Sequence, residues 1–258
     1  MVRDQAGHEK LGPVRLCALD LLYIRQSRKI SEMIGSYWNM DAVQHAVELV
    51  KEGDVVGMGT GRAATAFVRA LGERVRSGFS VCGIPTSEDT TQLARELGIP
   101  LTTFESVDKI DIAVDGADEV DPDLNLIKGY GGALIRERIV AAAARKFVVI
   151  VGREKLVKKL GERGKLPVEV VPFGVVPCCR HLETLSFVPV PRQDKNGLLY
   201  SDNGNALIDC EIETIENPRE LERSILAIPG IVGTGLFIGA TDVVLIDDDK
   251  GGQIRQRK

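Results

Sequence analysis

The chain has 258 residues and a formal net charge of −4, with 44% hydrophobic and 27% charged residues. This is an ordinary globular composition, and the length allows one large domain or two unequal ones. The sequence has no basic block that would attract DNA or an anionic membrane, and no apolar run of the ~20 residues that a spanning helix needs. We therefore expect no nucleic-acid partner and no membrane partner.

The five cysteines are odd in number and lack the paired CxxC spacing of a zinc or redox site. The adjacent Cys178 and Cys179 could oxidise or bind a soft metal, but buried structural cysteines are commoner. Residues 1–40 differ in texture from the rest and lack the uninterrupted apolar stretch of a secretory signal, so we treat them as an extension of unknown role. Together these features favour a reduced, cytoplasmic location.

From residue 41 onward, the apolar pattern alternates between the periods of helices and strands. It predicts helices at 42–50, 63–76, 90–97 and 134–145, and strands at 54–59, 79–83, 101–104, 110–114 and 147–151. The last two strands are almost wholly apolar, as parallel strands covered on both faces are. This order predicts an α/β fold, an open and mostly parallel sheet with helices on both faces.

The composition of the sequence changes near Leu166, where a proline-rich stretch begins. Short strands are expected at 198–202 and 205–212, separated by turn signals, with one helix at 218–227. The segment 235–249 supplies a final strand that can rejoin the first sheet. We therefore predict a main domain of residues 41–165 and 234–258, with a small α+β domain of residues 166–233 inserted into it.

Residues 57–61, Gly-Met-Gly-Thr-Gly, lie between a predicted strand and a helix, where backbone N–H groups can bind phosphate. The run from Gly59 also fits a dinucleotide fingerprint, but strand 79–83 lacks the acidic residue that holds the ribose, which argues against NAD. A turn that needs glycine only for its backbone conformation is the alternative interpretation. The next loop offers Ser87 or Thr86 as a helix cap and lies at the same sheet edge.

Four carboxylates crowd the turn after strand 110–114: Asp115, Asp118, Glu119 and Asp121. Crowding raises the pKa of at least one such group, which suits proton transfer near neutral pH. A calcium loop is the rival interpretation, but Gly116 stands at its second position and not at its sixth, so we expect no metal. A solvated acidic turn is the plain alternative.

Lys128 precedes the glycine-rich stretch 129–132, and Glu137 stands one turn into the helix that follows. A lysine beside free N–H groups can stabilise an oxyanion, and the glutamate is then within reach of the same ligand. Each could instead be a surface ion pair. In combination with the phosphate loop, they favour proton abstraction next to a carbonyl of a phosphorylated substrate.

Six segments, found in that family's order, resemble the A type of ribose-5-phosphate isomerase: VVGMGTG, GIPTSEDT, DIAVDGADEVDPDLNLIKGYGGALIRERIV, KLPVEVVPF, SDNGNALIDC and AIPGIVGTGLF. The resemblance covers roughly residues 41–247. It implies a Rossmann-like domain with a smaller inserted α+β (ferredoxin-like) domain, assembled as a homodimer or homotetramer. It also implies interconversion of D-ribose 5-phosphate and D-ribulose 5-phosphate through an enediolate, without cofactor or metal, in the non-oxidative branch of the pentose phosphate pathway.

The resemblance also assigns roles to single residues. It makes Glu137 the general base, sets Lys128 beside the developing oxyanion, and puts Asp115 and Asp118 at the substrate hydroxyls and ring oxygen. Lys155 matches a lysine that reaches the phosphate. The other substrate-binding residues that it implies are Thr60, Gly61, Arg62, Ala63, Gly116, Ala117, Gly129, Tyr130 and Gly131.

The chain departs from the family pattern at the phosphate loop, where Arg62 and Ala63 replace a Ser and a Thr. The Arg62 fork can restore the phosphate contact or block the site. The family's lysine early in the first helix is also absent, and Tyr130 adds a bulky side chain beside the pocket. Two alternatives therefore stay open: a non-catalytic sugar-phosphate-binding regulator, or an isomerase of another aldose phosphate.

Overall fold

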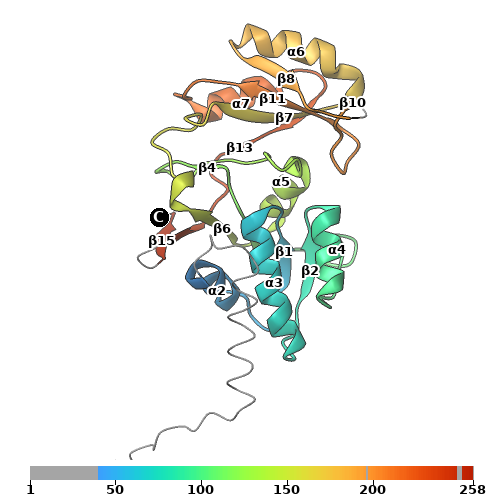
Figure 1. The fold of residues 1–258 in the computed structure, drawn as a ribbon, viewed down its shortest axis with the longest axis vertical. Coiled ribbons are helices and arrows are strands. Elements are labelled where there is room, and N and C mark those ends of the chain that lie inside the picture. The colour runs from blue at the N-terminus through green and yellow to red at the C-terminus, as the bar shows by residue number, and fades with distance from the viewer. Residues whose placement is uncertain (1–39, 196, 249–251, 258) are drawn as a thin grey trace, which may run out of the picture. The chain divides into compact units, whose positions relative to one another are not determined.

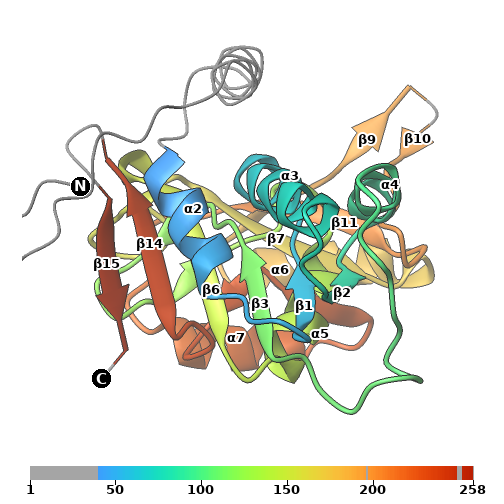
Figure 2. The same ribbon diagram turned by 90° about the horizontal axis from the view of Figure 1, so that it is seen from below.

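The main sheet has six strands in the order β15-β14-β6-β3-β1-β2 (Figures 1 and 2). It belongs to a computed structural model that describes residues 40–195, 197–248 and 252–257. Every neighbouring pair is parallel except β14 with β15. The strands are β1 Val55–Met58, β2 Cys82–Pro85, β3 Ile112–Asp115, β6 Phe147–Gly152, β14 Val243–Asp247 and β15 Gln253–Gln256.

Helices cover both faces of this sheet, because its strands are apolar on both sides. Val148 and Ile150 of β6 pack in one buried cluster with α2, α3 and α4, whereas Phe147 and Val149 pack in another cluster with α5. Side chains alternate along a strand, so a continuous apolar run supplies both faces. The predicted α/β class is confirmed. The helices are α2 Met40–Glu48, α3 Arg62–Arg76, α4 Glu88–Glu96 and α5 Leu134–Ala143.

A second sheet of four antiparallel strands has the order β12-β7-β11-β8. In chain order its elements are β7, α6, β8, β11, α7 and β12, which is the ferredoxin-like arrangement. Their bounds are β7 Lys165–Val170, α6 Val175–Thr184, β8 Val188–Pro191, β11 Ala206–Glu211, α7 Pro218–Leu226 and β12 Ile231–Thr234. A hairpin of β9 Gln193–Asp194 and β10 Gly197–Leu198 extends from β8. The exact domain boundaries stay a prediction.

A small third sheet of β4 Glu119–Val120, β5 Leu126–Ile127 and β13 Leu236–Phe237 supports the start of the glycine-rich loop. The N–H of Lys128, just after β5, donates to the carbonyl of Gly235. The N–H of Gly235 in turn donates to Pro167 of β7. The backbone at Lys128 is therefore tied, through Gly235, to the second sheet. Two short 3-10 helices, η1 Arg153–Lys155 and η2 Pro172–Gly174, complete the described elements.

Two predicted strands are wrong. Residues 101–104 make only an isolated bridge, from Leu101 to Gly83, and Phe104 is largely exposed, so this segment lacks a buried face. Residues 198–202 likewise form only the end of β10 and a single bridge at Tyr200. The strand expected at 79–83 lies further along the chain, at β2.

One helix, α6, lies in the proline-rich stretch, where the sequence predicts no helix. Pro177 stands in the first turn of α6, where its missing N–H would have had no helical acceptor. The final segment 235–249 also divides. Its second part, β14, joins the main sheet as predicted, whereas its first part, β13, pairs with β5.

The predicted extension of residues 1–40 lies outside the described residues, except that Met40 begins α2. Across the described chain, no helix combines the length and the apolar character that crossing a membrane needs.

Gly59, which follows β1, has no room for a side chain. A Cβ there would lie 2.2 Å from the carboxyl carbon of Asp115. We expect Gly59→Ala to lower the free energy of unfolding by about 1–3 kcal/mol, because a buried carboxylate must move. Urea unfolding measures this. Gly116→Ala is the control, since its Cβ would meet nothing closer than 3.5 Å. Equal losses in both variants would contradict the close approach.

Candidate active site

The candidate site lies where the strand order reverses, between the carboxyl ends of β1 and β3. The chain runs from β1 to β2 on one side and then returns to β3 on the other. The loops after β1 and β3 therefore separate, and such a crevice is where ligands bind in open α/β sheets. A cavity of about 260 Å³ opens here. Its lining residues are Thr60, Gly61, Arg62, Ala63, Gly116, Ala117, Asp118, Lys128, Gly129, Gly131, Glu137, Ile150 and Lys155.

All of the predicted site residues line this cavity except Asp115 and Tyr130. One lining residue, Ile150, was not predicted. It belongs to β6, and its apolar type carries no chemical signal, so only the position of β6 beside β3 brings it to the cavity.

Three buried ionisable side chains meet at the floor of the cavity. The Lys128 ammonium lies 3.0 Å from Asp115 Oδ2 and 3.3 Å from Glu137 Oε2, and it donates to the Gly116 carbonyl at 2.6 Å. The side chains of Lys128, Asp115 and Glu137 are only 3%, 4% and 5% exposed. One cation therefore faces two carboxylates with little water to screen them.

Burial raises the pKa of Glu137 to about 8, and the neighbouring Asp115 acts in the same direction, whereas Lys128 opposes both. Burial alone would lower the pKa of Lys128, but the two carboxylates together raise it above its ordinary value. Burial also raises the pKa of Asp115, against the pull of Lys128 and two backbone N–H groups. Asp115 is the better hydrogen-bonded of the two carboxylates, since it accepts two backbone N–H groups besides its contact with Lys128.

Asp115 lies behind the cavity wall and not on its surface. Its Oδ1 accepts the N–H groups of Thr60 at 3.2 Å and of Gly116 at 2.7 Å, while its other oxygen faces Lys128. One carboxylate thus ties the loop after β1 to the loop after β3 and orients the lysine between them.

Asp118 lines the cavity, and its Oδ2 accepts the N–H of Tyr130 at 3.0 Å. The expectation that Tyr130 adds bulk to the pocket is wrong. Its ring packs against the buried core of the second sheet, with the Lys165 ammonium 4.5 Å from the ring centre, and its hydroxyl donates to the Lys165 carbonyl at 3.2 Å. The side chain points away because the second sheet offers it an apolar surface.

The other two acids of the crowded turn have local structural partners. Glu119 is buried and accepts the N–H groups of Gly161 and Arg163. Asp121 accepts the N–H groups of Asp123 and Asn125, which closes its own turn. Within the described chain, no group of three or more His, Cys, Asp or Glu side chains is arranged to hold a metal ion. The described cysteines, Cys82, Cys178, Cys179 and Cys210, are free thiols.

The mouth of the cavity is suited to an anion. Gly61 precedes α3 with a φ of 94°, and no side chain caps that helix, so its first N–H groups face the crevice. Arg62 and Lys155 line the same opening, and neither forms an ion pair with another described residue. Two available cations and a helix N-terminus together favour a phosphate group.

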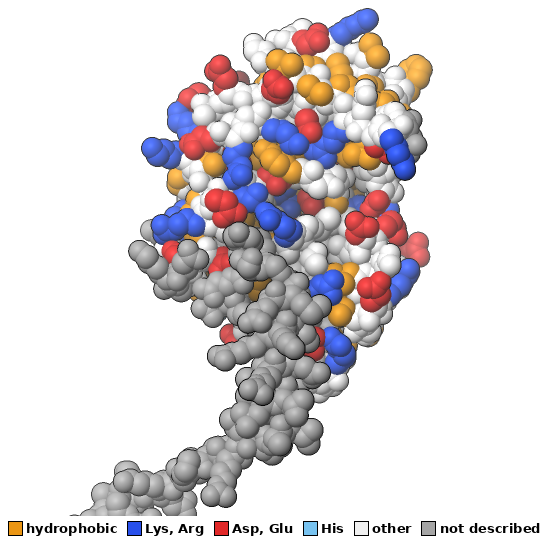
Figure 3. Space-filling view, in the orientation of Figure 1, with side chains coloured by type: hydrophobic (Ala, Val, Ile, Leu, Met, Phe, Trp, Pro, Cys, Tyr) orange, Lys and Arg blue, Asp and Glu red, His pale blue; other side chains and the backbone are white. Residues whose placement is uncertain are grey.

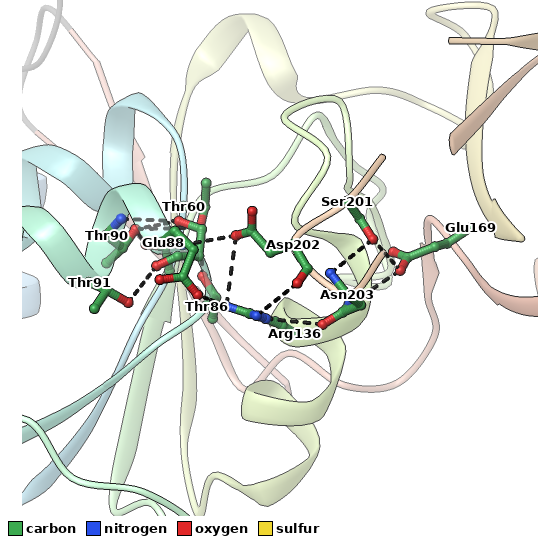
Figure 4. Close-up of polar contacts among 12 residues, drawn as sticks. Thr60, Thr86, Glu88, Thr90, Thr91, Arg136, Glu169, Ser201, Asp202 and Asn203 are labelled. Atoms are coloured by element: carbon green, nitrogen blue, oxygen red, sulfur yellow. Dashed lines mark hydrogen bonds and ion pairs between the residues drawn. The ribbon is translucent and has the colours of Figure 1, made fainter. Parts of the chain in front are cut away.

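A chain of hydrogen bonds supports Thr60 from behind (Figure 4). Its hydroxyl lies 2.7 Å from that of Thr86 and donates to Ser87 at 2.9 Å. Ser87 is the predicted cap of α4, since its side chain accepts the N–H of Thr90. The loop after β2 therefore supports the cavity wall at Thr60.

The start of α4 is in turn tied to the second sheet (Figure 4). The N–H of Glu88 donates to Asp202 Oδ2 at 2.9 Å, and Arg136, the neighbour of Glu137, donates to Glu88 at 2.8 Å and to Asn203 at 3.0 Å. Sequence reasoning missed this link, because the turn at 201–203 lies far from α4 and α5 along the chain. In the sequence, the residues at 201–203 predict a turn, but they do not indicate what that turn contacts.

Comparison with known proteins agrees with this geometry. The family model for ribose 5-phosphate isomerase A (phosphoriboisomerase A) matches residues 82–251. The chain belongs to this family. The ribose-5-phosphate isomerase A of Roseiflexus sp. (strain RS-1) is 46% identical over 222 residues, which cover 85% of this chain and 95% of that protein. The resemblance seen in the sequence motifs is therefore confirmed.

Solved structures of ribose 5-phosphate isomerases share the fold as well. The enzyme from Methanocaldococcus jannaschii matches with a TM-score of 0.80 at 43% identity, over 84% of this chain and 96% of that one. A D-ribose-5-phosphate isomerase in complex with phospho-erythronic acid matches with a TM-score of 0.81 at 37% identity, over the same shares of the two chains.

The raised pKa of Glu137 links stability to pH. In the folded protein the group releases its proton at about 8, and in the unfolded chain near its ordinary value, about 4.3. The stabilisation of the folded protein by protonated Glu137 is complete below about pH 4.3 and is lost as the pH rises through 8. Relative to Glu137→Gln, the parent should lose unfolding free energy between about pH 5 and pH 9, by at most about 1.4 kcal/mol per pH unit. Urea unfolding across this range measures the difference, and parallel pH profiles would contradict it.

Proposed function

We propose that this protein interconverts D-ribose 5-phosphate and D-ribulose 5-phosphate, as an aldose-ketose isomerase of the non-oxidative pentose phosphate pathway. The observation that carries the proposal is the buried Lys128 between Asp115 and Glu137, at the floor of a cavity whose mouth is suited to phosphate. The relatives that match over most of the chain carry the same enzyme name, which supports the assignment.

Glu137 acts as the general base. Its ionised carboxylate takes the proton from C2 of the open-chain aldose, and the electron pair of that C–H bond forms the C1–C2 double bond while the carbonyl π pair moves to O1. The resulting enediolate then takes the proton back from Glu137 at C1, as the oxygen on C2 becomes a carbonyl and the O2 proton passes to O1. A pKa of about 8 suits both steps near neutral pH, because the group can accept and return a proton.

Lys128 stabilises the charge that develops on the substrate oxygens. Its ammonium is fixed by Asp115 and the Gly116 carbonyl, so it needs no reorganisation during the reaction. Asp115 acts in this proposal as a positioning residue, and Asp118, which lines the cavity, contacts the hydroxyls and ring oxygen during ring opening. A fixed cation and a general base supply the chemistry, so the proposed mechanism uses no metal ion and no organic cofactor.

The phosphate lies at the mouth of the cavity in this proposal. The first N–H groups of α3, the Arg62 fork and the Lys155 ammonium hold it, with Thr60 and Ala63 alongside. The related enzyme bound to phospho-erythronic acid supports this class of ligand, since that compound joins a phosphate to a carboxylate. A carboxylate has the charge and planar shape of an enediolate end.

The predicted homodimer or homotetramer and the predicted cytoplasmic location stay proposals. Apolar side chains gather over the end of the molecule where α6 and β8 lie (Figure 3), and Val176, Val188 and Val190 of these elements are exposed. Exposed apolar surface of this kind supports contact between copies.

The decisive test is turnover of D-ribose 5-phosphate by the purified protein in the presence of EDTA. We expect Glu137→Gln to lower kcat by about 10²–10⁴-fold, because a general base of this kind contributes that much. Glu105→Gln, at an exposed position, is the matched control and should retain the parental rate. Calorimetry with phospho-erythronic acid shows whether the variant still binds. Undiminished turnover by Glu137→Gln would refute the base assignment, and binding without turnover by the parent would favour the regulator.

The phosphate assignment is tested through KM. Lys155→Met and Arg62→Ala should each raise KM for D-ribose 5-phosphate by about 10-fold, since a charge-assisted hydrogen bond contributes about 1.5–3 kcal/mol. The change in kcat should be smaller, because the phosphate contact is the same in substrate and transition state. Steady-state kinetics on both variants decides this. A lower KM in Arg62→Ala would instead mean that Arg62 obstructs the site.

A further inference from the structure

The glycine-rich loop at 129–132 forms one wall of the cavity, and its carbonyls are held by an arginine of the second sheet. Arg192, just after β8, donates to the Gly129 carbonyl at 2.9 Å and to the Tyr130 carbonyl at 3.1 Å. Its side chain is 11% exposed. Nothing in the proposed mechanism uses this arginine, which lies far along the chain from the catalytic residues.

The guanidinium is itself held in place by Asp209 of β11. Arg192 donates to both oxygens of this carboxylate, at 2.9 Å and 2.6 Å, in the planar two-point geometry that an arginine fork allows. Lys165 of β7 adds a third donor at 2.9 Å. Burial alone would raise the pKa of Asp209, but the hydrogen bonds from Arg192 and Lys165 outweigh it and keep this pKa below its ordinary value. The carboxylate therefore stays charged.

The direction of the two carbonyls determines the direction of the N–H groups across the same peptide bonds. A trans peptide is planar, so its N–H points opposite to its C=O, and the described chain has no cis peptide. The Gly129 carbonyl faces Arg192 and the N–H of Tyr130 faces Asp118. By the same geometry, the N–H of Gly131 points away from Arg192. Gly131 lines the cavity, and no described residue accepts this N–H.

We propose that Arg192 and Asp209 are positioning residues, which present the N–H of Gly131 to the substrate oxygen where negative charge develops. The inference rests on the proposed isomerase function and extends it to residues outside the cavity. The loop needs such support because Gly129 and Gly132 both adopt positive φ, and glycine by itself leaves the backbone many conformations. A donor fixed in advance favours the enediolate over the substrate.

We call the contact of the Arg192 guanidinium with the two loop carbonyls and the Asp209 carboxylate the clamp. Its geometry requires an arginine. A lysine at 192 would keep the charge but offers no planar fork, so it cannot hold two carbonyls and a carboxylate at once. Lys159 provides the comparison: its ammonium forms an exposed ion pair with Glu216, and within the described residues it bonds neither Asp209 nor a loop carbonyl. Arg192→Lys and Asp209→Asn are therefore the test variants, and Lys159→Met is the control.

Steady-state kinetics and amide hydrogen exchange together test the proposal. In Arg192→Lys and Asp209→Asn, kcat should fall by about 10–100-fold while KM changes by less than about 3-fold, since one oxyanion donor contributes about 10²–10³ in kcat. Binding of phospho-erythronic acid should weaken in parallel with kcat. Exchange of the amides of residues 129–132 should be about 10-fold faster or more, because the loop opens more often. Lys159→Met should stay within about 3-fold of the parent in each measurement, because an exposed ion pair contributes little.

Each outcome either supports or overturns the positioning role of Arg192 and Asp209. Parental kcat in Arg192→Lys, or an equal loss in Lys159→Met, would overturn the positioning role, even if the thermal stability of all three variants fell. If the parent itself has no turnover, the proposed function fails on its own. The hydrogen exchange of residues 129–132 then still decides the clamp, because unchanged exchange in Arg192→Lys would refute it without reference to activity.

Discussion

The buried contact of Lys128 with Asp115 and Glu137 is the constraint on which the rest of the site depends. Burying charged groups is costly unless they are paired and hydrogen-bonded, and here one cation serves two carboxylates. Asp115 contacts Lys128 and also accepts hydrogen bonds from two backbone N–H groups. Glu137 contacts Lys128 at a longer distance, and burial raises its pKa to about 8. This difference between two neighbouring acids suits the roles proposed for them, Asp115 as a support and Glu137 as the proton carrier.

The main sheet makes this contact possible through a close approach of β1 and β3. Gly59 leaves room for the Asp115 carboxylate where any other residue would place a Cβ. The same reversal of strand order opens the crevice above them, with the uncapped start of α3 on one side. The proposed phosphate site at the mouth of the cavity and the proposed position of the reacting carbon at its floor therefore both lie at the crevice that this topology opens.

The second sheet does more than extend the fold, because it supports the cavity from outside. Through the turn at 201–203 it contacts Arg136 and the start of α4, and through Arg192 it holds the carbonyls of Gly129 and Tyr130. Tyr130 anchors the same loop by packing into the apolar core of that sheet. Loops rich in glycine bind ligands closely but lack rigidity, so a second domain that fixes their backbone complements them.

The sequence alone determined the fold class and the chain order of the elements that build the main sheet. Apolar strands followed by polar loops place the loops after β1 and β3 at one sheet edge, and Thr60 and Asp118 of these loops line the cavity as expected. Local chemistry also predicted a cap at Ser87 or Thr86, and the structure has it at Ser87. No pattern in the sequence indicated α6, which lies in the proline-rich stretch and has Pro177 in its first turn. Only the tertiary structure decided that Tyr130 turns away from the cavity, that Asp115 lies behind the cavity wall, and that Arg192 reaches the glycine-rich loop. Those outcomes depend on which distant surface is available to each side chain, and local patterns carry no information about distance in space.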